Sequence, residues 1–337
     1  MAANRAYADI GSGYPVNWRS VVVMSHANDM DGIASAALIF RRFNVPPSNL
    51  FFSDYSAEAL GYAKRRICKM RGIDALFITD LSLNDSFKPI YAEIIKTVKR
   101  LGGRVFWFDH HPWKDDDVKN IGGMCDVAIV GENKKYCATE ITAAELGLND
   151  KFARNLLRIV HISDFNLEPR DAHTRSLIGT YALGITYCNT LKSRAAIYKK
   201  LRHIVAVIGS GRLSDALLDH DADTFRRTNR ERIKKMLTAL YVSKGQGIAV
   251  GFSKDVQSTE ACMEIIRRAR VDIGVYVNTE SKTGHIRSVR SDSSPLARSL
   301  GGNGHPHASG FPVKGSMPGS ERRIALGIIS EWKRIMR

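Results

Sequence analysis

The sequence is poor in the features that mark secreted, membrane and zinc-ribbon proteins. It has five cysteines among 337 residues, and no two of them have the Cys-x-x-Cys spacing of a zinc ribbon. No apolar run approaches the length of a membrane-spanning helix, and the first residues lack the apolar stretch of a secretory signal. An odd number of scattered cysteines is typical of a reducing compartment. We therefore expect a cytoplasmic protein without a membrane partner.

The composition is that of a globular protein, apart from its charge. Hydrophobic residues make up 44% of the chain and charged residues 25%, and the length is sufficient for two domains with separate cores. The formal net charge of +16 is unusual. It favours a polyanionic partner such as a nucleic acid or a phosphorylated substrate. A generally basic proteome or the surface of a thermophile protein would give the same charge.

Short β-branched or aromatic runs alternate with helical patterns in the first half of the chain. This alternation predicts an α/β fold with a parallel sheet. We expect its strands at residues 21–25, 50–53, 75–79 and 104–108. We expect its helices at residues 32–43, 56–70, 87–101, 139–146 and 151–162.

The second half predicts a long basic helix at residues 221–240 and then a smaller α/β domain. The strands of that domain are expected at residues 247–252, 273–278 and 285–289, and its helices at 259–270 and 321–335. The predicted domains are residues 1–190, a helical connector at 191–243, and a second domain at 244–337.

Acids and histidines follow three of the predicted strands. They are His26, Asp29 and Asp31 after the first strand, Asp80 after the third, and Asp109, His110 and His111 after the fourth. Ligands bind at the carboxyl edge of an open α/β sheet. Carboxylates and histidines gathered there would repel or desolvate one another unless cations held them. The pattern predicts a metal centre with two ions, and imidazole combined with carboxylates suits Mn²⁺, Fe²⁺ or Zn²⁺ better than Ca²⁺.

Each of these motifs also has a structural interpretation. An Asp-Gly turn with a capping Asp would explain Asp29 and Asp31, and an Asp after a strand is often the N-cap of the next helix, which would explain Asp80. Adjacent histidines directly after an aromatic strand are harder to explain in this way. Side chains alternate along an extended chain, so one of His110 and His111 could bind metal while the other meets substrate. The preceding aspartate could orient a histidine.

The second predicted domain contains residues suited to phosphate. Backbone N–H groups of a glycine-rich loop at 301–310, together with His305 and Ser309, could cradle a phosphate. The segment Arg287-Ser-Val-Arg290-Ser291 adds guanidinium and hydroxyl donors. Basic runs at residues 64–66 and 226–235 are more often solvated helix faces than binding sites.

Taken together, the motifs resemble those of the DHH phosphoesterase superfamily, in its branch with a C-terminal DHHA1 domain. That branch includes RecJ-like exonucleases, oligoribonucleases and cyclic-dinucleotide phosphodiesterases. The resemblance covers about residues 20 to 310. The matching motifs, in family order, are His26…Asp29-x-Asp31-Gly32, Asp80, Asp109-His110-His111, Asp164 and the loop Gly301-Gly-Asn-Gly-His305 with Ala308-Ser-Gly310. Two departures are a gap from His26 to Asp29 that is one residue short and an Asn303 in place of a loop glycine.

The resemblance implies a role for each matching residue. His26, Asp29 and Asp80 would hold one ion, and Asp31, Asp80, His110 and Asp164 the other, with Asp80 as the bridge. The family's usual metal is Mn²⁺, with Mg²⁺ and Co²⁺ as alternatives. His111 and Asp109 would be the catalytic residues beside the phosphate. The substrate-binding residues would be Arg290, Ser291, Gly301, Gly302, Asn303, His305 and Ser309.

The function implied is hydrolysis of single-stranded DNA, RNA or short oligonucleotides to mononucleotides, in a cleft between the two domains. One alternative is cleavage of cyclic dinucleotides or 3′-phosphoadenosine phosphate. Another is a non-catalytic subunit of a replication or repair assembly, which the presence of all six expected metal ligands disfavours. The sequence leaves open the polarity of digestion, the choice between DNA and RNA, the oligomeric state, and a replication or repair partner such as a helicase.

Overall fold

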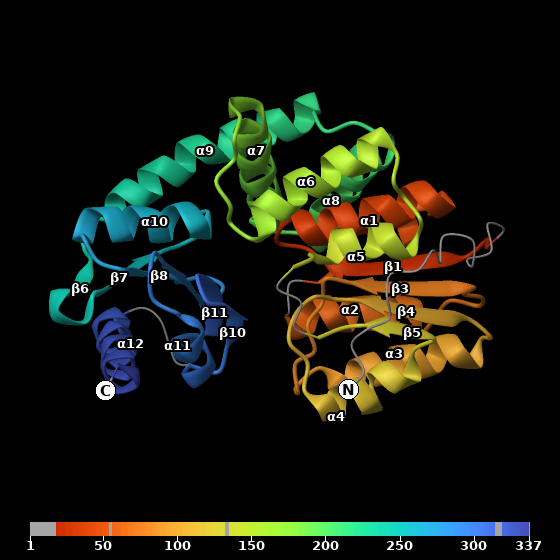
Figure 1. The fold of residues 1–337 in the computed structure, drawn as a ribbon, viewed down its shortest axis with the longest axis horizontal. Coiled ribbons are helices and arrows are strands. Elements are labelled where there is room, and N and C mark those ends of the chain that lie inside the picture. Colours follow the sequence, from red (N-terminus) through yellow and green to blue (C-terminus); the bar gives the residue numbers. More distant parts are fainter. Residues whose placement is uncertain (1–17, 54–55, 132–134, 314–318, 337) are drawn as a thin grey trace. The chain divides into compact units, whose positions relative to one another are not determined.

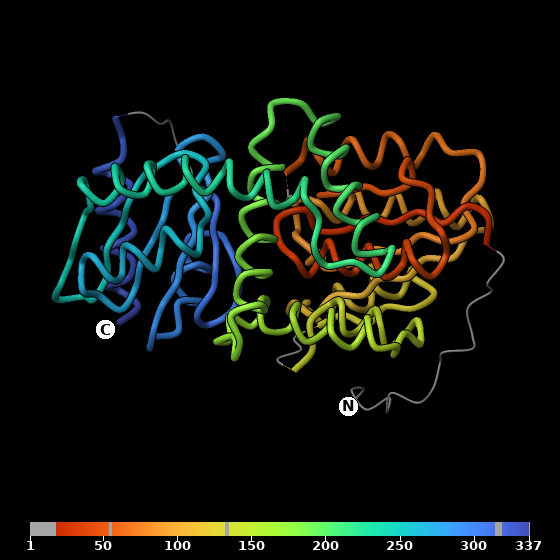
Figure 2. The backbone as a smooth tube through the Cα atoms, turned by 90° about the horizontal axis from the view of Figure 1, so that it is seen from above, coloured from red at the N-terminus to blue at the C-terminus, as the bar shows by residue number. Residues whose placement is uncertain are grey.

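The computed structural model describes residues 18–53, 56–131, 135–313 and 319–336. The chain folds into two compact units that divide between Ala222 and Asp223. The division falls inside helix α9 (Ala216–Met236), which is continuous in sequence across it, and the backbone trace in Figure 2 follows the chain through this helix. Each unit has its own sheet and its own core.

The first unit is built on a parallel sheet with strand order β2-β1-β3-β4-β5. The strands are β1 (Val21–His26), β2 (Leu50–Ser53), β3 (Ala75–Thr79), β4 (Arg104–Phe108) and β5 (Val127–Ile129). In β1 to β4 nearly every side chain is buried, as expected where helices cover both faces of a parallel sheet. This burial explains why the strand sequences are continuous apolar runs.

Helices cover both faces of this sheet (Figure 1). On one side, α1 (Met30–Phe43) packs against β1, and α5, α6, α7 and α8 pack around α1. On the other side, α2 lies against β2 and α3 against β4. The bounds of these helices are α2 (Ala57–Ile67), α3 (Lys88–Arg100), α4 (Asp115–Asn120), α5 (Ala138–Glu145), α6 (Lys151–Asp164), α7 (Ala172–Asn189) and α8 (Arg194–Gly209).

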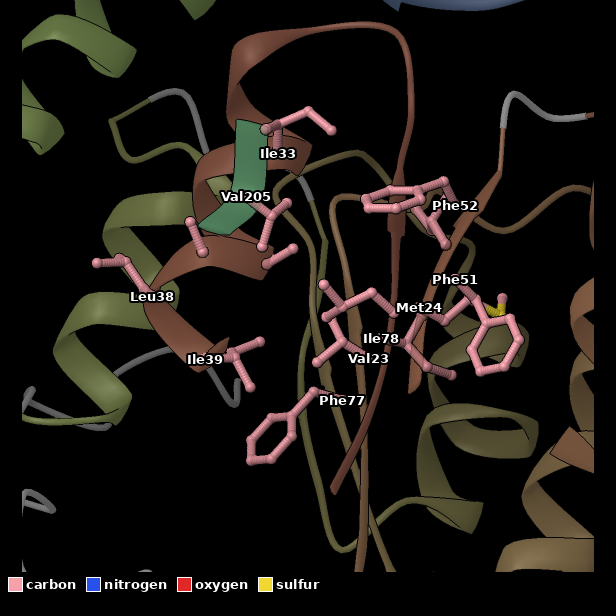
Figure 3. Packing of buried hydrophobic residues seen from close by; sticks show 14 of the residues in the cluster. Val23, Met24, Ile33, Leu38, Ile39, Phe51, Phe52, Phe77, Ile78 and Val205 are labelled. Atoms are coloured by element: carbon pink, nitrogen blue, oxygen red, sulfur yellow. The ribbon is translucent and has the colours of Figure 1, made fainter. Parts of the chain in front are cut away.

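Small residues make the central position of α1 possible. Residues 30–39 of this helix are all buried, so the helix meets neighbours on every side. Next to this stretch, a Cβ added to Gly209 of α8 would overlap the ring of Phe40. Figure 3 shows part of the core, in which Val23 and Phe77 of the sheet lie on the same side as Ile39 of α1.

The second unit has a mixed sheet with strand order β10-β11-β9-β8-β7-β6, in which only β7 and β8 are parallel. Helix α10 packs on one face, and α12 covers β6 and β7 on the other (Figure 1). The strands are β6 (Tyr241–Ser243), β7 (Ile248–Ser253), β8 (Ile273–Asn278), β9 (Thr283–Ser288), β10 (Asn303–His305) and β11 (Ala308–Pro312). The helices are α10 (Ser258–Ala269), α11 (Ser294–Ser299) and α12 (Glu321–Ile335).

Short 3-10 turns complete the described elements: η1 (Pro47–Asn49), η2 (Gly122–Met124) and η3 (Lys244–Gln246). None of the helices in the described part of the chain is long and apolar enough to cross a bilayer.

The α/β class and the parallel first sheet predicted from the sequence are confirmed. One local prediction is wrong, because the glycine-rich segment 301–310 forms the hairpin of β10 and β11 instead of a loop. Its glycines allow close packing within the sheet: a Cβ on Gly302 would overlap the carbonyl of Gly310, and a Cβ on Gly304 would lie 2.5 Å from the Cα of Ser309. Asn303 has no positive φ and lies exposed, so this position does not require glycine.

Candidate metal centre

The strand order places the candidate ligands at one edge of the first sheet. All five strands run parallel, so their carboxyl ends meet at the same edge. The order reverses between β1 and β3, and ligands bind at such a switch point in open α/β sheets. Asp29 and Asp31 follow β1, Asp80 follows β3, and His110 follows β4. Side chains far apart in sequence are thus brought to the same place by topology.

The imidazole of His110 lies at the centre of three carboxylates. Its Nε2 atom is 3.8 Å from Oδ2 of Asp31, 3.7 Å from Oδ1 of Asp80 and 3.7 Å from Oδ2 of Asp164. The side chains of His110, Asp31 and Asp80 are at most 2% exposed, and that of Asp164 is 15% exposed. Asp164 arrives from the last turn of α6, on the α1 side of the sheet. Four candidate ligands therefore converge in a buried place.

Asp80 occupies an unusual backbone conformation. Its φ is 53°, in the left-handed region that non-glycine residues seldom adopt. Its backbone N–H donates to the carbonyl of Phe108 in β4 at 2.9 Å, which continues the pairing of β3 with β4 by one residue. The strained turn directs the chain away from the sheet directly after β3. Strain of this kind is concentrated at functional sites, where the surrounding structure holds it in place.

Asp31 is held by the start of helix α5. Its Oδ2 accepts the backbone N–H of Ala138 at 2.8 Å, and its Oδ1 accepts the N–H of Thr139 at 2.7 Å and the hydroxyl of Thr139 at 2.6 Å. A carboxylate is stabilised at a helix N-terminus by these donors and by the helix dipole. Oδ2, with a single hydrogen bond, is the oxygen that faces His110.

The electrostatics of this cluster favour a bound cation. Burial, and next the charges of Asp29 and Asp31, raise the pKa of Asp80 well above its ordinary value. Burial and Asp31 raise the pKa of Asp164 in the same way. Burial, and next the charge of His111, lower the pKa of His110, so its imidazole is neutral and able to bind metal at neutral pH. Without cations, the charged forms of these acids are disfavoured by burial and by mutual repulsion.

The donor set fits a divalent metal ion. Two ligand atoms that are each about 2.1 Å from one ion lie about 3–4 Å apart, and the His110–carboxylate separations fall in that range. Among the described residues, no hydrogen-bond donor reaches the buried Oδ2 atom of Asp164, which leaves it able to bind an ion. One imidazole with several carboxylates suits Mn²⁺, Fe²⁺ or Zn²⁺. Ligand atoms of Asp31, His110 and Asp164 all lie within 4.8 Å of one another.

His111 is oriented by the residue two positions before it. Its Nδ1 is 2.7 Å from Oδ1 of Asp109, and Trp113 donates its indole N–H to Oδ2 of the same carboxylate at 2.8 Å. Burial opposes a charged imidazolium, but the charge of Asp109 and this hydrogen bond outweigh burial and raise the pKa of His111 to about 9. His111 is therefore protonated at neutral pH, while neighbouring His110 is neutral.

The first motif forms a compact group of its own. Nε2 of His26 is 3.4 Å from Oδ2 of Asp29, and the Nδ1 atom of His26 is 3.2 Å from the carbonyl of Ser53. Asp29 also caps α1 by accepting the N–H of Gly32 at 3.1 Å, as the structural interpretation predicted. A Cβ on Gly32 would lie 2.5 Å from the carbonyl oxygen of His26. Among the described residues, neither His26 nor Asp29 belongs to a group of three candidate ligands whose ligand atoms all lie within 4.8 Å of one another.

The candidate substrate residues of the second unit have mixed surroundings. The side chain of Arg290 is 84% exposed, and its Nε lies 3.5 Å from Oδ1 of Asp272. Asp272 also accepts the backbone N–H groups of Arg290 and Ser291, each at 2.9 Å. Ser309 is buried, and its hydroxyl lies 3.0 Å from that of Ser293. Ser309 thus has a partner within the protein, whereas Arg290 is open to solvent.

The remaining candidates belong to the β10–β11 region. Gly301 has a φ of 84° and precedes the hairpin, and Gly302 packs closely on Gly310. Asn303 and His305 are the first and last residues of β10. Asn303 pairs with Gly310, and His305 pairs with Ala308. These residues therefore lie together on the edge hairpin of the second sheet.

Two residues of the first unit were missed at the sequence level. Thr139 fixes Asp31, and Trp113 fixes Asp109. Thr139 stands at the start of a predicted helix, where hydroxyl residues are common as caps. Its partner, however, lies 108 residues earlier, and nothing in the local sequence connects the two.

No protein-family model and no curated protein matches this sequence. Solved structures do match it. An exopolyphosphatase-related protein from Bacteroides fragilis has a TM-score of 0.51 and 14% identity, covering 94% of this chain and 93% of that one. The pGpG-specific phosphodiesterase PggH from Vibrio cholerae has a TM-score of 0.53 and 11% identity, covering 94% and 99%. RecJ from Thermus thermophilus, in complex with Mn²⁺, has a TM-score of 0.52 and 13% identity, covering 94% of this chain and 52% of RecJ.

These similarities are similarities of fold. The chain shares its α/β fold with these three proteins. It matches two of these proteins over nearly their whole length and RecJ over about half.

Proposed function

We propose that the chain is a metal-dependent phosphodiesterase that hydrolyses single-stranded DNA, RNA or short oligonucleotides to mononucleotides. The observation that carries this proposal is the convergence of Asp31, Asp80 and Asp164 on the neutral imidazole of His110 at the carboxyl edge of the sheet. The fold shared with RecJ and PggH supports it. The proposed catalytic domain is residues 1–190, followed by a connector at 191–243 and a substrate-binding domain at 244–337.

The same residues define the proposed chemistry. Asp31, Asp80, His110 and Asp164 would hold one divalent ion, and His26 and Asp29, with Asp80, a second. When bound, two such ions supply a nucleophilic water near neutral pH and neutralise charge on phosphoryl oxygens. We propose Mn²⁺, with Mg²⁺ or Co²⁺ as substitutes.

Residues that need not touch the metal complete the reaction. His111, charged and oriented by Asp109, would donate a hydrogen bond from Nε2 to a phosphoryl oxygen or a proton to the leaving group. Arg290, Ser291, the Gly301–Gly302 backbone, Asn303, His305 and Ser309 are proposed to bind the substrate. For Ser309 this role would be indirect, through Ser293 and the shape of the hairpin.

A second candidate function is cleavage of a small phosphorylated substrate, such as a linear or cyclic dinucleotide or 3′-phosphoadenosine phosphate. The fold shared with PggH, a pGpG-specific phosphodiesterase, supports it, with a TM-score of 0.53. A non-catalytic role is disfavoured, because all six expected ligands are present and four of them converge. A replication or repair partner stays an expectation from the resemblance. The five free cysteines support the cytoplasmic location we propose.

The test is a hydrolysis assay with defined substrates. The full chain would be incubated with Mn²⁺ and end-labelled single-stranded DNA, single-stranded RNA, pGpG or a cyclic dinucleotide. Mononucleotide products from the single strands would support the first candidate, and turnover of the dinucleotides alone would support the second. His110→Ala is the control, since it removes the central imidazole. Equal turnover by this variant would refute the proposed site.

A further inference from the structure

Glu140 of α5 and His161 of α6 join their two helices by a hydrogen bond between half-buried side chains. Nδ1 of His161 lies 2.9 Å from Oε2 of Glu140. Because a carboxylate only accepts hydrogen bonds, Nδ1 of His161 is the donor in this contact. Both helices also pack against α1 (Figure 1). Neither residue is among the candidate metal ligands, yet each lies within one helical turn of a group that forms the metal centre.

At one end of this pair, Glu140 supports the residues that hold Asp31. The same Oε2 atom accepts the backbone N–H of Cys137 at 2.9 Å, which is one half of the capping box at the start of α5. Cys137 directly precedes Ala138 and Thr139, whose N–H groups donate to the Asp31 carboxylate at 2.8 and 2.7 Å. The position of that carboxylate therefore depends on the helical turn that Glu140 closes.

At the other end, His161 supports the helical turn that carries Asp164. The two residues are three apart in α6, so their side chains are neighbours on the helix surface. The ring of His161 also packs against that of Phe165, with centroids 4.7 Å apart, and the Phe165 ring lies 6.1 Å from the ring of His110. The last turn of α6, which brings Asp164 to the metal centre, is thus tied to α5 through His161.

The pair therefore connects two candidate ligands that face the same imidazole. Nε2 of His110 is 3.8 Å from Oδ2 of Asp31 and 3.7 Å from Oδ2 of Asp164. The separation of ligand atoms determines which ion they suit, since oxygen ligands lie about 2.0–2.2 Å from Zn²⁺ but about 2.3–2.6 Å from Ca²⁺. A contact that keeps α5 and α6 together keeps the two carboxylates close, and this favours the smaller ion.

We propose that His161, held by Glu140, is a positioning residue for the metal ion and makes the site prefer Mn²⁺ to the larger Ca²⁺. This proposal rests on the proposed function, since it takes Asp31, His110 and Asp164 as ligands of one ion. The pair acts through the first turn of α5 and the last turn of α6, without touching the ion. Residues that orient metal ligands typically contribute about 10- to 100-fold in affinity, and an indirect contact belongs at the lower end of that range.

The experiment measures metal binding, so it does not depend on catalysis. Mn²⁺ would be titrated into the metal-free full chain and the free ion followed by electron paramagnetic resonance, and Ca²⁺ affinity would be measured by competition with Mn²⁺. His161→Leu removes the N–H donor and keeps an apolar side chain in its place. We expect Mn²⁺ to bind about tenfold more weakly to this variant. Ca²⁺ should lose less affinity, because its longer bonds suit a wider site.

Further variants show whether the hydrogen bond itself is responsible. The amide of an asparagine can place an N–H near the position of Nδ1, whereas the longer glutamine places it near that of Nε2. His161→Asn should therefore keep much of the Mn²⁺ affinity, and His161→Gln should behave like His161→Leu. Glu140→Ala should also weaken Mn²⁺ binding. In the double variant with His161→Leu, the loss should be smaller than the product of the two single losses, because both substitutions remove the same contact.

His203→Leu is the matched control. Nε2 of His203 lies 2.9 Å from Oδ1 of Asp215, so this pair joins α8 to the start of α9 in the same unit by the same kind of hydrogen bond. In the part of the chain that the structure describes, neither residue belongs to a group of three candidate ligands. The control should keep the wild-type affinity for both ions. Melting temperatures in EDTA would show that each variant is folded.

The inference fails if His161→Leu keeps the wild-type affinity for Mn²⁺, or if its affinities for Mn²⁺ and Ca²⁺ fall equally. A lower melting temperature with unchanged affinities would make the pair a simple tether between helices. Failure of the wild-type chain to bind Mn²⁺ would refute the metal centre, and with it both this inference and the proposed function. Mn²⁺ binding that depends on His161, without hydrolysis of any substrate, would refute the proposed function alone. The two failures can therefore be told apart.

Discussion

Asp31 and Thr139 are 108 residues apart in sequence and are joined by two hydrogen bonds, one from the backbone N–H of Thr139 and one from its hydroxyl. The hydroxyl of Thr139 donates to Oδ1 of Asp31 at 2.6 Å and lies 2.8 Å from its backbone carbonyl, and the N–H of Thr139 donates to Oδ1 at 2.7 Å. These bonds occupy Oδ1 and leave Oδ2 directed at His110. The start of α5 thereby decides which oxygen of Asp31 can reach a metal ion.

Thr139→Val should weaken metal binding without unfolding the protein. The substitution keeps the shape of the side chain but removes the hydroxyl that fixes Asp31. Groups that orient a metal ligand typically contribute about 10- to 100-fold in affinity, and we expect about tenfold here. Titration with Mn²⁺, followed by electron paramagnetic resonance of the free ion, measures the change. Thr139→Ser should restore most of the affinity, and an unaltered affinity in the valine variant would contradict this role.

Asp80→Asn should abolish hydrolysis yet stabilise the metal-free protein. The bridging carboxylate is lost, so activity with Mn²⁺ should fall by more than about 100-fold, the upper range for a supporting residue. Asparagine tolerates the positive φ of this position, and it removes a buried acid whose charged form is disfavoured by burial and by the neighbouring carboxylates. The melting temperature in EDTA should therefore rise. Near-normal turnover would refute the two-ion site, and a large fall in melting temperature would contradict the electrostatic argument.

The stability of the protein should fall in mild acid because of His285. Burial, and next the charge of Arg287, lower the pKa of His285 to about 4, whereas in the unfolded chain it is about 6.5. Protonation then favours the unfolded state, so this contribution is complete above pH 6.5 and is lost as the pH falls toward 4. The ring is partly exposed, and we expect a loss of about 1 kcal/mol between pH 7 and pH 5.

Urea unfolding of the wild-type chain and of His285→Gln at both pH values measures this effect. The difference between the two proteins isolates the histidine from the acidic cluster, whose carboxyls also titrate. The wild-type chain should lose more stability than the variant on acidification. The same loss in both proteins would show that His285 does not contribute.

Long single strands should bind in a salt-dependent way through the basic helix α9. Arg227 and Arg230 are exposed on this helix, whereas Arg226 is paired with Asp223. Each phosphate contacted on a single strand contributes about −0.7 to the slope of log K against log salt. Replacing both Arg227 and Arg230 by alanine should make the slope less negative by about 1.4. Arg226→Ala is the control and should change the slope less.

Binding of a labelled long single strand at several salt concentrations gives these slopes. Dinucleotide cleavage should be unaffected by the double substitution. If the binding of a dinucleotide and of a long strand depends equally on salt, the basic residues of α9 are ordinary surface charges. The second candidate function, cleavage of a small phosphorylated substrate, is then the better supported one.

The strands that are buried on both faces could be predicted closely from the sequence, whereas the partly buried strands β5, β6, β10 and β11 were not predicted. Residues 75–79, 104–108 and 273–278 have the predicted bounds, since a fully buried strand is a continuous apolar run that ends at a polar residue. Helices α7 and α8 were not predicted. Their apolar residues pack against α1 and each other, and this requirement is visible only once the tertiary structure is known.

The convergence of Asp31 and Asp80 with His110 followed from one rule, that parallel strands end at one edge, whereas Asp164, at the end of α6, was expected there only from the family resemblance. What could not be predicted depends on contacts made by other elements. The inward position of Ser309 follows from strand β11, which its glycine-rich sequence concealed. The hydrogen bond from Thr139 to Asp31 depends on the position of the first residues of α5 in the tertiary structure. Local patterns describe which residues could act, and packing decides which of them can reach one another.

The close approach of Gly32 to His26 also has a thermodynamic consequence. Because a Cβ would lie 2.5 Å from the carbonyl oxygen of His26, the end of β1 and the first turn of α1 are in van der Waals contact through the backbone. His26, Asp29 and Asp31 are therefore preorganised by the main chain, and little conformational entropy remains to be lost when an ion binds. Even the smallest addition, Gly32→Ala, would separate the strand from the helix, and the cost would appear as weaker metal affinity in a folded protein.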